Sequence, residues 1–358
     1  MKLGIVGLPF SGKTFLFEAI TGAHKAAGDF SVAAHTAAIA VPDERLDKIA
    51  AVSSPKKVTH AHVDFVDVPG VEAGKSKEHN VGVLSALREV DGLVHVVRFF
   101  DSPAAPPHPH GSLDPARDVR ELEAELLLAD LDIAERRVEK LEKQVFKGTP
   151  HQDHDKKELA ALQRVKKALE EGTHVSALGL SEGESRLLRA YRFLSEMPML
   201  YVLNVHEDAL DSEETKRAAD ALGKNAVVIS ARIEKEISEL DPDERQEFVD
   251  ALGFSDPASR RIIRASYEAL GLRSFFTGTD ADQELRAWTV HAGDTALTAA
   301  GKIHTDMVRG FIRAEVCSWE DVLAAGSCKQ AKAQGKTRLE GKDYVVQDGD
   351  VITFRFNV

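Results

Sequence analysis

Five short apolar runs, separated by helical or irregular sequence, dominate the hydrophobic pattern of this chain. They are KLGIVG (2–7), HVDFVD (62–67), GLVHVVRFF (92–100), MLYVLN (199–204) and AVVIS (226–230). Continuous apolar strands rich in β-branched residues are typical of a parallel sheet that is covered on both faces. The pattern therefore predicts a doubly wound α/β domain, whose first helix is TFLFEAI at residues 14–20.

A long polar region interrupts the alternation of apolar runs and helical segments after the third run. A proline-rich loop at 102–115 leads into a charged helix with a narrow apolar stripe, and a polar break at 147–155 leads into a second one. The stripes consist of Val119, Leu122, Leu126, Ile133, Leu141 and Val145, then Leu159, Leu162, Val165 and Leu169. Two such helices predict an antiparallel coiled-coil hairpin. The alternative is a pair of further helices that pack on the same core.

The pattern changes again after about residue 275. Short strands around one or two helices predict a small α+β domain that ends in a strand, and Asp348-Gly349-Asp350 predicts a hairpin turn between two alternating runs. We therefore expect three domains. They are an α/β sheet domain of residues 1–115 and 196–274, a helical insert of residues 116–195, and a C-terminal domain of residues 275–358.

Composition and charge narrow the classes of function. With 358 residues, 43% hydrophobic and 29% charged, the chain is ordinary for a globular protein of about two or three domains. The two cysteines, Cys317 and Cys328, exclude a disulfide framework and favour a reducing cytoplasm. Because no apolar run could cross a bilayer and a strand pattern starts at once, we expect no secretory signal and no membrane partner. The net charge of −12 argues against DNA as a partner.

Residues 7–15, GLPFSGKTF, carry the spacing G-x-x-x-x-G-K-[ST] between a predicted strand and a predicted helix. Gly7 and Gly12 would let backbone N–H groups turn inward around phosphate oxygens. Lys13 would reach the β- and γ-phosphates, and the Thr14 hydroxyl would bind Mg²⁺. A glycine turn with only a structural role does not require Lys followed by Thr, so the motif predicts a nucleoside triphosphate site.

A carboxylate at the end of the next apolar run is expected to complete this site. Asp67 and Gly70 form the pattern D-x-x-G there. Asp67 would hold Mg²⁺, and the Gly70 N–H would sense the γ-phosphate. Many GTPases have a Gln after this glycine that orients the attacking water, and Val71 cannot form that hydrogen bond. We therefore expect slow intrinsic turnover, with His79 as a candidate for orienting water and a solvated loop histidine as the alternative.

The segment that would read the base is unusual. GTPases recognise guanine with N-K-x-D, which does not occur in this chain; Asn204-Val205-His206-Glu207 stands at the corresponding strand end. Glu207 is one methylene longer than the aspartate, and loss of such a bidentate contact removes about 1–3 kcal/mol of discrimination. Ser230 and Ala231 follow the last strand, where GTPases place a backbone N–H against the base. These features favour ATP over GTP.

Together these motifs resemble the YchF / Obg-like ATPase family of P-loop NTPases in the translation-factor class. GLPxxGKT, N-x-x-E and the charged insert carry the resemblance. RAWTVHAGDTALTAAGKIHTDMVRGFIRAEV and RLEGKDYVVQDGDVITFRFNV are similar to the ubiquitin-like TGS domain at that family's C-terminus. The resemblance covers nearly the whole chain and implies an ATPase that uses Mg²⁺ and associates with ribosomes. It places nucleotide contacts on Phe10, Ser11, Gly12, Lys13, Thr14 and Phe15, and Val205 beside the adenine.

The chain also departs from the family pattern. Phe10-Ser11 replaces the usual Asn-Val, and a segment like TIEPN is missing; SVAAHTAAIAVPDERLD stands in its region. In this segment Thr36 would be the second Mg²⁺ ligand, and Ser31 is the alternative. The departures are those of a diverged member with slow or altered turnover.

We therefore expect a cytoplasmic P-loop NTPase that hydrolyses ATP, or also GTP, and acts as a ribosome-associated switch. The alternatives are a GTP-preferring enzyme and a nucleotide-gated binding module with negligible catalysis. The TGS and coiled-coil domains would contact the ribosome or its RNA. The densest basic stretch of the last domain consists of Lys329, Lys332, Lys336, Arg338 and Lys342, which would contact RNA phosphates or form a solvated face. His108, His110, His151 and His154 are interpreted as solvated loop residues rather than zinc ligands.

Overall fold

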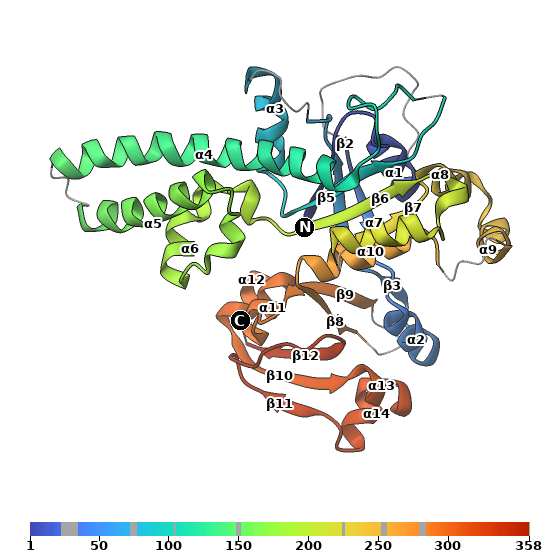
Figure 1. The fold of residues 1–358 in the computed structure, drawn as a ribbon. Helices are drawn as coiled ribbons and strands as arrows, with labels where there is room; N and C mark the ends of the chain where they lie inside the picture. Colours follow the sequence, from blue (N-terminus) through green and yellow to red (C-terminus); the bar gives the residue numbers. More distant parts are fainter. Residues whose placement is uncertain are drawn as a thin grey trace. The chain divides into compact units, whose positions relative to one another are not determined.

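The structure is a computed structural model that describes residues 1–22, 35–71, 77–103, 105–147, 152–223, 226–251, 256–278 and 284–357. The side chains of residues 77–79, 147, 242, 243, 246 and 251 lie outside this description. The chain divides into two compact units, Met1–Ala37 with Asp64–Ser259 and Ala38–Val63 with Arg260–Val358. Each unit is built around a six-stranded sheet (Figure 1).

The sheet of the first unit has the strand order β2-β4-β1-β5-β6-β7. Its strands are β1 (Lys2–Val6), β2 (His35–Ala40), β4 (His62–Asp67), β5 (Gly92–Phe99), β6 (Met199–Val205) and β7 (Ala226–Ile229). The pairs β1–β4, β1–β5, β5–β6 and β6–β7 are parallel, so the predicted parallel sheet is confirmed. The edge strand β2 was not predicted, because none of its side chains is buried and it lacks an apolar run.

Helices follow the strands of the first unit. They are α1 (Lys13–Thr21), α3 (Lys77–Leu87), α4 (Pro115–Lys147), α5 (Gln152–Glu170), α6 (Glu182–Leu188), α7 (Glu213–Leu222), α8 (Ala231–Glu239) and α9 (Pro242–Ala251). Short 3₁₀ turns are η1 (Val175–Leu178), η2 (Arg189–Tyr191), η3 (Leu194–Glu196) and η4 (Glu207–Ala209). Among the described residues, none of the helices combines the length and the apolar composition needed to span a membrane.

Helix α4 is a single helix of 33 residues whose two halves pack against different partners. The first half buries Leu122 and Leu126 in a core cluster with residues of β1, β5 and α3. The second half buries Val138 and Leu141 in a cluster with Leu162 of α5, and Figure 1 shows α5 alongside it. The first half of α4 therefore packs on the sheet core and the second half on α5, while the coiled-coil hairpin stays a prediction.

The second unit contains a mixed sheet with the order β11-β10-β12-β8-β9-β3. Its strands are β3 (Lys57–Thr59), β8 (Leu272–Thr277), β9 (Glu284–His291), β10 (Phe311–Ser318), β11 (Arg338–Glu340) and β12 (Asp350–Phe356). Its helices are α2 (Glu44–Ser53), most of α10 (Ala258–Ala269), α11 (Ala296–Ile303), α12 (Thr305–Arg309), α13 (Trp319–Ala325) and α14 (Cys328–Ala333). β12–β8 and β3–β9 are parallel, whereas β8–β9, β10–β11 and β10–β12 are antiparallel.

The second unit differs in two respects from what the sequence led us to expect. It begins near Arg260, and it includes residues 38–63 from the N-terminal part of the chain, so β3 joins the second sheet. The hairpin expected at Asp348-Gly349-Asp350 is wrong, because β12 pairs with β10 and β8. The aspartates fix a loop instead: Asp348 accepts a hydrogen bond from the Ser274 N–H at 2.9 Å. The division into three domains stays a prediction.

Candidate nucleotide-binding site

The loop between β1 and α1 has the shape that its glycines allow. Gly7 has a φ of 154° and Gly12 a φ of 96°, where a side chain is strained. A Cβ at Gly7 would lie 2.4 Å from the Val96 carbonyl oxygen, and a Cβ at Gly12 would lie 2.2 Å from Asn204 Nδ2. Because both glycines are required by space as well as by conformation, the loop is a fixed cradle rather than an ordinary surface turn.

Lys13 begins α1, and its ammonium group lies against the loop. Nζ donates hydrogen bonds to the carbonyl oxygens of Gly7 at 3.2 Å and Leu8 at 2.8 Å, and the residue is only 8% exposed. Burial lowers the pKa of Lys13 to about 8, and the nearby Asp67 carboxylate partly offsets this effect. A buried cation with one nearby carboxylate favours a further anionic ligand.

Strand β4 brings the D-x-x-G residues to the phosphate loop. Asp67 is the last residue of β4, is buried, and is the carboxylate that acts on Lys13. A Cβ at Gly70 would lie 3.0 Å from Lys13 Nζ and 3.4 Å from the Pro9 nitrogen, so the Gly70 backbone lies directly against the loop. Val71 is buried in the core next to α4 and offers no polar atom for orienting water.

The polar atoms around the loop fit a triphosphate with Mg²⁺. Thr14 is exposed in the first turn of α1, and hydroxyl and carboxylate oxygens such as those of Thr14 and Asp67 are the ligands that Mg²⁺ prefers. Ser11 is buried, and its hydroxyl has no hydrogen-bond partner among the described atoms. A buried hydroxyl without a partner costs free energy unless a ligand or water satisfies it.

Asn204 ties the phosphate loop to the start of α8. Its Nδ2 donates to the Ser11 carbonyl oxygen at 2.9 Å, and its Oδ1 accepts a hydrogen bond from the Ala231 N–H at 3.0 Å. The side chain is buried between these partners. The geometry therefore gives Asn204 a positioning role in the site, and a direct contact between Asn204 and the base stays a prediction.

The other residues expected near the base lie at the ends of β6 and β7. Val205 is buried in a core cluster, so its side chain offers little open surface to an adenine. Glu207 begins η4, and its carboxylate lies 3.9 Å from Arg232 Nε. Ser230 and Ala231 are buried at the start of α8.

The remaining switch candidates are only partly described. Thr36 is exposed on the edge strand β2, and its role as a metal ligand stays a prediction. Ser31 lies outside the described residues. The backbone of His79 belongs to α3, whereas its side chain lies outside the description.

Two residues beside the loop were missed by the sequence analysis. Glu18 of α1 and Lys235 of α8 form an ion pair of 2.8 Å. Lys235 Nζ also lies 4.8 Å from the ring centroid of Phe15, which was expected to be a nucleotide contact. No local pattern could have paired Glu18 with Lys235, because the pair forms only when α1 packs against α8.

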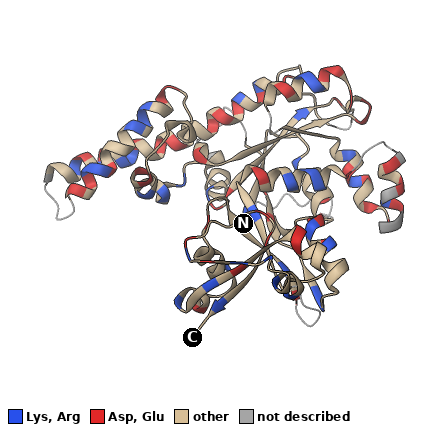
Figure 2. Ribbon diagram, turned by 90° about the horizontal axis from the view of Figure 1, so that it is seen from below, with Lys and Arg blue, Asp and Glu red and all other residues tan. Residues whose placement is uncertain are grey.

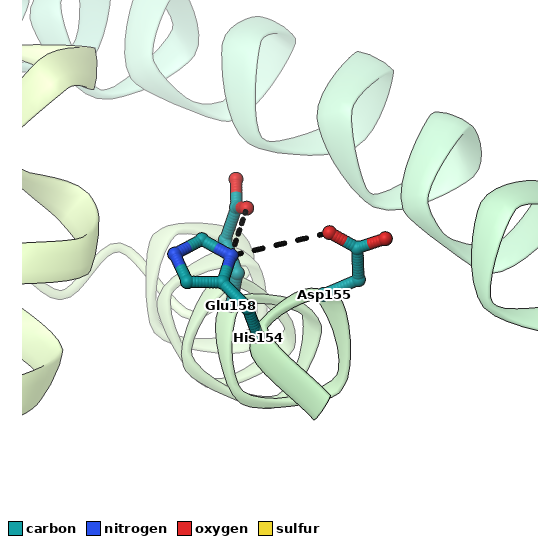
Figure 3. Close-up of side chains that lie close together, drawn as sticks. All are labelled: His154, Asp155 and Glu158. Atoms are coloured by element: carbon teal, nitrogen blue, oxygen red, sulfur yellow. Dashed lines mark ion pairs between the residues drawn. The ribbon is translucent and has the colours of Figure 1, made fainter. Parts of the chain in front are cut away.

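The histidines of the two polar turns form no metal site within the described residues. The side chain of His108 is only 6% exposed, and its Nε2 lies 3.0 Å from Asp118 Oδ2, so its interpretation as a solvated residue is wrong. On α5, His154 Nδ1 lies 3.9 Å from a carboxylate oxygen of Asp155 and from one of Glu158 (Figure 3). Glu158, however, accepts two hydrogen bonds from Arg137, at 2.8 and 2.9 Å. Since this guanidinium would repel a metal ion, the cluster belongs to the packing of α5 against α4. His151 lies outside the described residues.

Two family models and several curated relatives match this chain. A family model described as a 50S ribosome-binding GTPase matches residues 2–146, and a model for the C-terminal part of YchF GTPases, described as a protein of unknown function, matches residues 272–357. The "Ribosome-binding ATPase YchF" of Bacillus subtilis is 41% identical over 100% of both chains. That of Haemophilus ducreyi is 40% identical over 100% of this chain and 99% of the relative.

A solved structure supports the same assignment. The Schizosaccharomyces pombe YchF GTPase matches with a TM-score of 0.82 and 28% identity, over 99% of this chain and 97% of that chain. The fold is therefore that of an α/β P-loop GTPase. Since relatives matched over their full length share about two fifths of their residues with it, the chain belongs to the YchF family.

Proposed function

We propose that the protein is a Mg²⁺-dependent ATPase that acts as a ribosome-associated switch. The observation that carries the proposal is the buried Lys13 ammonium in its glycine cradle, with Asp67 close enough to act on its charge and Gly70 against the loop. The names of the bacterial relatives, which call them ribosome-binding ATPases, support the nucleotide and the partner.

The reaction is in-line attack of water on the γ-phosphoryl group. Mg²⁺ held by Thr14 and Asp67 would neutralise charge on the phosphate oxygens. Lys13 would redirect its hydrogen bonds from the loop carbonyls to these oxygens, and the loop N–H groups would stabilise the charge that develops in the transition state. Because Val71 cannot orient the attacking water, His79 is the candidate for that role, and intrinsic turnover is slow. Thr36 is the candidate for the second Mg²⁺ ligand.

We infer a preference for ATP from the residue that replaces the guanine-reading aspartate. The longer Glu207 carries its carboxylate near Arg232, at 3.9 Å, instead of ending in the shorter side chain that pairs with guanine. A GTP-preferring enzyme is the alternative, and the name of the fission yeast relative favours it.

Single-turnover hydrolysis of radiolabelled ATP and GTP, with and without Mg²⁺, tests the proposal. Lys13→Ala should lower the rate by about 100-fold or more, because it removes a charged group that stabilises the transition state. Asp67→Asn should weaken the dependence on Mg²⁺. Lys140→Ala, an exposed lysine on α4, is the matched control and should leave the rate unchanged.

Each outcome has a distinct meaning. Faster turnover of GTP than ATP would support the alternative specificity. Tight binding without hydrolysis by the wild type would contradict the enzyme and support a nucleotide-gated binding module. An unchanged rate in Lys13→Ala would contradict the assignment of the site.

We further propose that the C-terminal TGS-like region and the α4–α5 pair contact the ribosome. Figure 2 shows acidic residues interspersed with basic ones. The proposed contact therefore cannot rest on a broad basic face and must rest on individual basic residues. In the basic stretch, Lys332 pairs with Glu315 and Lys336 with Asp321, each at 2.7 Å. The exposed Lys329 and Lys342, which have no carboxylate partner among the described residues, are therefore the strongest candidates.

Cosedimentation with ribosomes over a range of salt concentrations tests this contact. Phosphate contacts weaken steeply as salt rises, so a variant with Lys329→Glu and Lys342→Glu should bind more weakly and with a shallower salt dependence. Lys302→Glu, an exposed lysine of α11 in the same unit, is the control. Equal effects of both changes would mean that the basic stretch has no special role.

A further inference from the structure

An exposed aromatic ring lies one residue after the phosphate loop and contacts a lysine of α8. Phe15 directly follows the proposed metal ligand Thr14, and it is 50% exposed. A single exposed apolar residue is common and needs no function. Phe15 differs because Lys235 Nζ lies 4.8 Å from its ring centroid, within the range of a cation–π contact.

The lysine that contacts this ring is itself fixed. Lys235 Nζ forms an ion pair of 2.8 Å with Glu18, whose side chain is largely buried on the next turn of α1. The two helices α1 and α8 pack against each other, so the three side chains connect rigid elements. We call Phe15, Lys235 and Glu18 the aromatic platform.

Both helices that carry the platform begin at the nucleotide site. Helix α1 begins at Lys13, two residues before Phe15. Helix α8 begins at Ala231, one turn before Lys235. The Ala231 N–H donates a hydrogen bond to the Asn204 side chain, which donates one to the Ser11 carbonyl oxygen in the phosphate loop. A nucleotide with its phosphates in the loop and its base toward Asn204 would therefore carry its nucleoside past Phe15.

We propose that the aromatic platform binds the nucleoside half of the nucleotide by contact with the Phe15 ring. This inference rests on the proposed nucleotide site. It assigns affinity for the nucleoside and discrimination between bases to different residues of that site. Every base has a π-face, so an aromatic ring supplies affinity with little preference for one base. Phe15 therefore contributes affinity for ATP and GTP alike, while discrimination between them lies with the segment that contains Glu207.

Lys235 and Glu18 act as positioning residues for the ring. The ammonium group is attracted to the negative face of the aromatic ring, and Glu18 keeps the ammonium group in place. This arrangement limits the rotamers of Phe15 before a ligand arrives, which lowers the entropy lost on binding.

Competition binding against a fluorescent ATP analogue tests the proposal with three ligands, ATP, GTP and inorganic triphosphate. Phe15→Ala should weaken ATP and GTP by roughly tenfold to hundredfold, the range of aromatic stacking on one base, and should change triphosphate affinity by less than about twofold. Phe15→Tyr keeps the ring and should bind all three ligands like the wild type. Phe146→Ala, which removes a 93% exposed phenylalanine from α4, is the matched control.

The positioning residue has a separate test. Lys235→Gln should weaken both nucleotides less than Phe15→Ala does, and Lys235→Arg should restore binding because the guanidinium also stacks on an aromatic ring. A general packing defect would weaken triphosphate as well, and would not be rescued by arginine.

The outcomes separate this inference from the proposed function. Unchanged ATP and GTP affinity in Phe15→Ala would overturn the aromatic platform while leaving the nucleotide site intact. A parallel loss of triphosphate would also overturn it, because the loop itself would then be damaged. If the wild type binds none of the three ligands, the proposed function fails and the platform with it.

Discussion

At the scale of single residues, Phe10 introduces a measurable strain into the phosphate loop. It has a φ of 62°, in the left-handed region, although it is neither glycine nor asparagine. This conformation costs an ordinary L-residue about 1–2 kcal/mol, and asparagine tolerates it better through local hydrogen bonds. We expect Phe10→Asn to raise the free energy of unfolding by about 1 kcal/mol. The midpoint of urea unfolding, followed by circular dichroism, measures this gain.

A second variant separates strain from the loss of an exposed ring. Phe10→Leu removes the aromatic group but keeps the strained conformation, so it should give no gain in stability. If both variants unfold at the same urea concentration, the left-handed conformation is not the cause.

We expect His95 to make the stability of the protein sensitive to acid. It is fully buried on β5, near Lys13 and the ring of Tyr201, and neither ring nitrogen has a hydrogen-bond partner among the described atoms. Burial, together with the Lys13 charge, lowers the pKa of His95 to about 3. Below about pH 6.5 the unfolded chain binds a proton that the folded protein excludes, so stability falls by up to about 1.4 kcal/mol for each pH unit.

The matching experiment compares His95→Leu with the wild type. Thermal unfolding midpoints between pH 7.5 and 5 should fall less steeply for the variant, because its side chain cannot take up a proton. Parallel pH profiles would show that other groups cause the acid sensitivity.

At the scale of single residues, local motifs were predictable and long-range contacts were not. The glycines, Lys13 and Thr14 were identified because their spacing is local. Asp67 was identified because it ends a strand next to β1. The bond from Asn204 to the loop spans 193 residues, and no local pattern indicates which groups its amide will satisfy.

At the scale of secondary structure, burial decided which elements could be predicted. The five apolar runs became parallel strands: β1, β4, β5 and β6 are mostly buried, and β7 has three half-buried residues and one buried residue. The strands β2 and β3 have no buried side chain and were missed. Helix α4 was predicted, but its single apolar stripe did not reveal that the stripe passes from the sheet core to α5.

This change of partner along α4 predicts a selective effect of one core substitution. Leu162 of α5 is fully buried against the second half of α4, so Leu162→Ala should destabilise the helical pair by about 2–5 kcal/mol. Hydrogen exchange should accelerate in α5 and in the second half of α4 while ATP binding is kept. Leu128→Ala, at an exposed position of α4, is the control. Equal acceleration in β1 and β5 would show that the two halves unfold together.

At the scale of the whole molecule, each of the two units combines two stretches that are separate in the sequence. Arg45, from the N-terminal part of the chain, forms ion pairs with Asp43 and Asp348 at 2.8 Å and lies over the Phe276 ring at 5.6 Å. Its two carboxylate partners raise the pKa of Arg45, against the effect of burial. Residues 38–63 are therefore a structural part of the second unit rather than a loop of the first.

Removing this contact should destabilise the second unit alone. We expect Arg45→Ala to lower its free energy of unfolding by about 1–2 kcal/mol, through lost ion pairs, ring contact and packing of the side-chain stem. Both tryptophans, Trp288 and Trp319, lie in this unit, so their fluorescence follows its unfolding in urea. Lys48→Ala, on the same helix, is the control, and an equal shift would argue against the Arg45 contacts.

The pairing of β3 with β9 has a consequence for how the protein is made. The hydrogen bond between Thr59 and Glu284 joins residues 225 positions apart. At about 5–20 residues per second, β3 waits roughly 10–45 s after its own synthesis before its partner strand exists. During that time it is a strand edge open to incorrect pairing. The second unit thus completes its sheet only when most of the chain has been translated, and a protein shortened before β9 would leave this edge exposed for good.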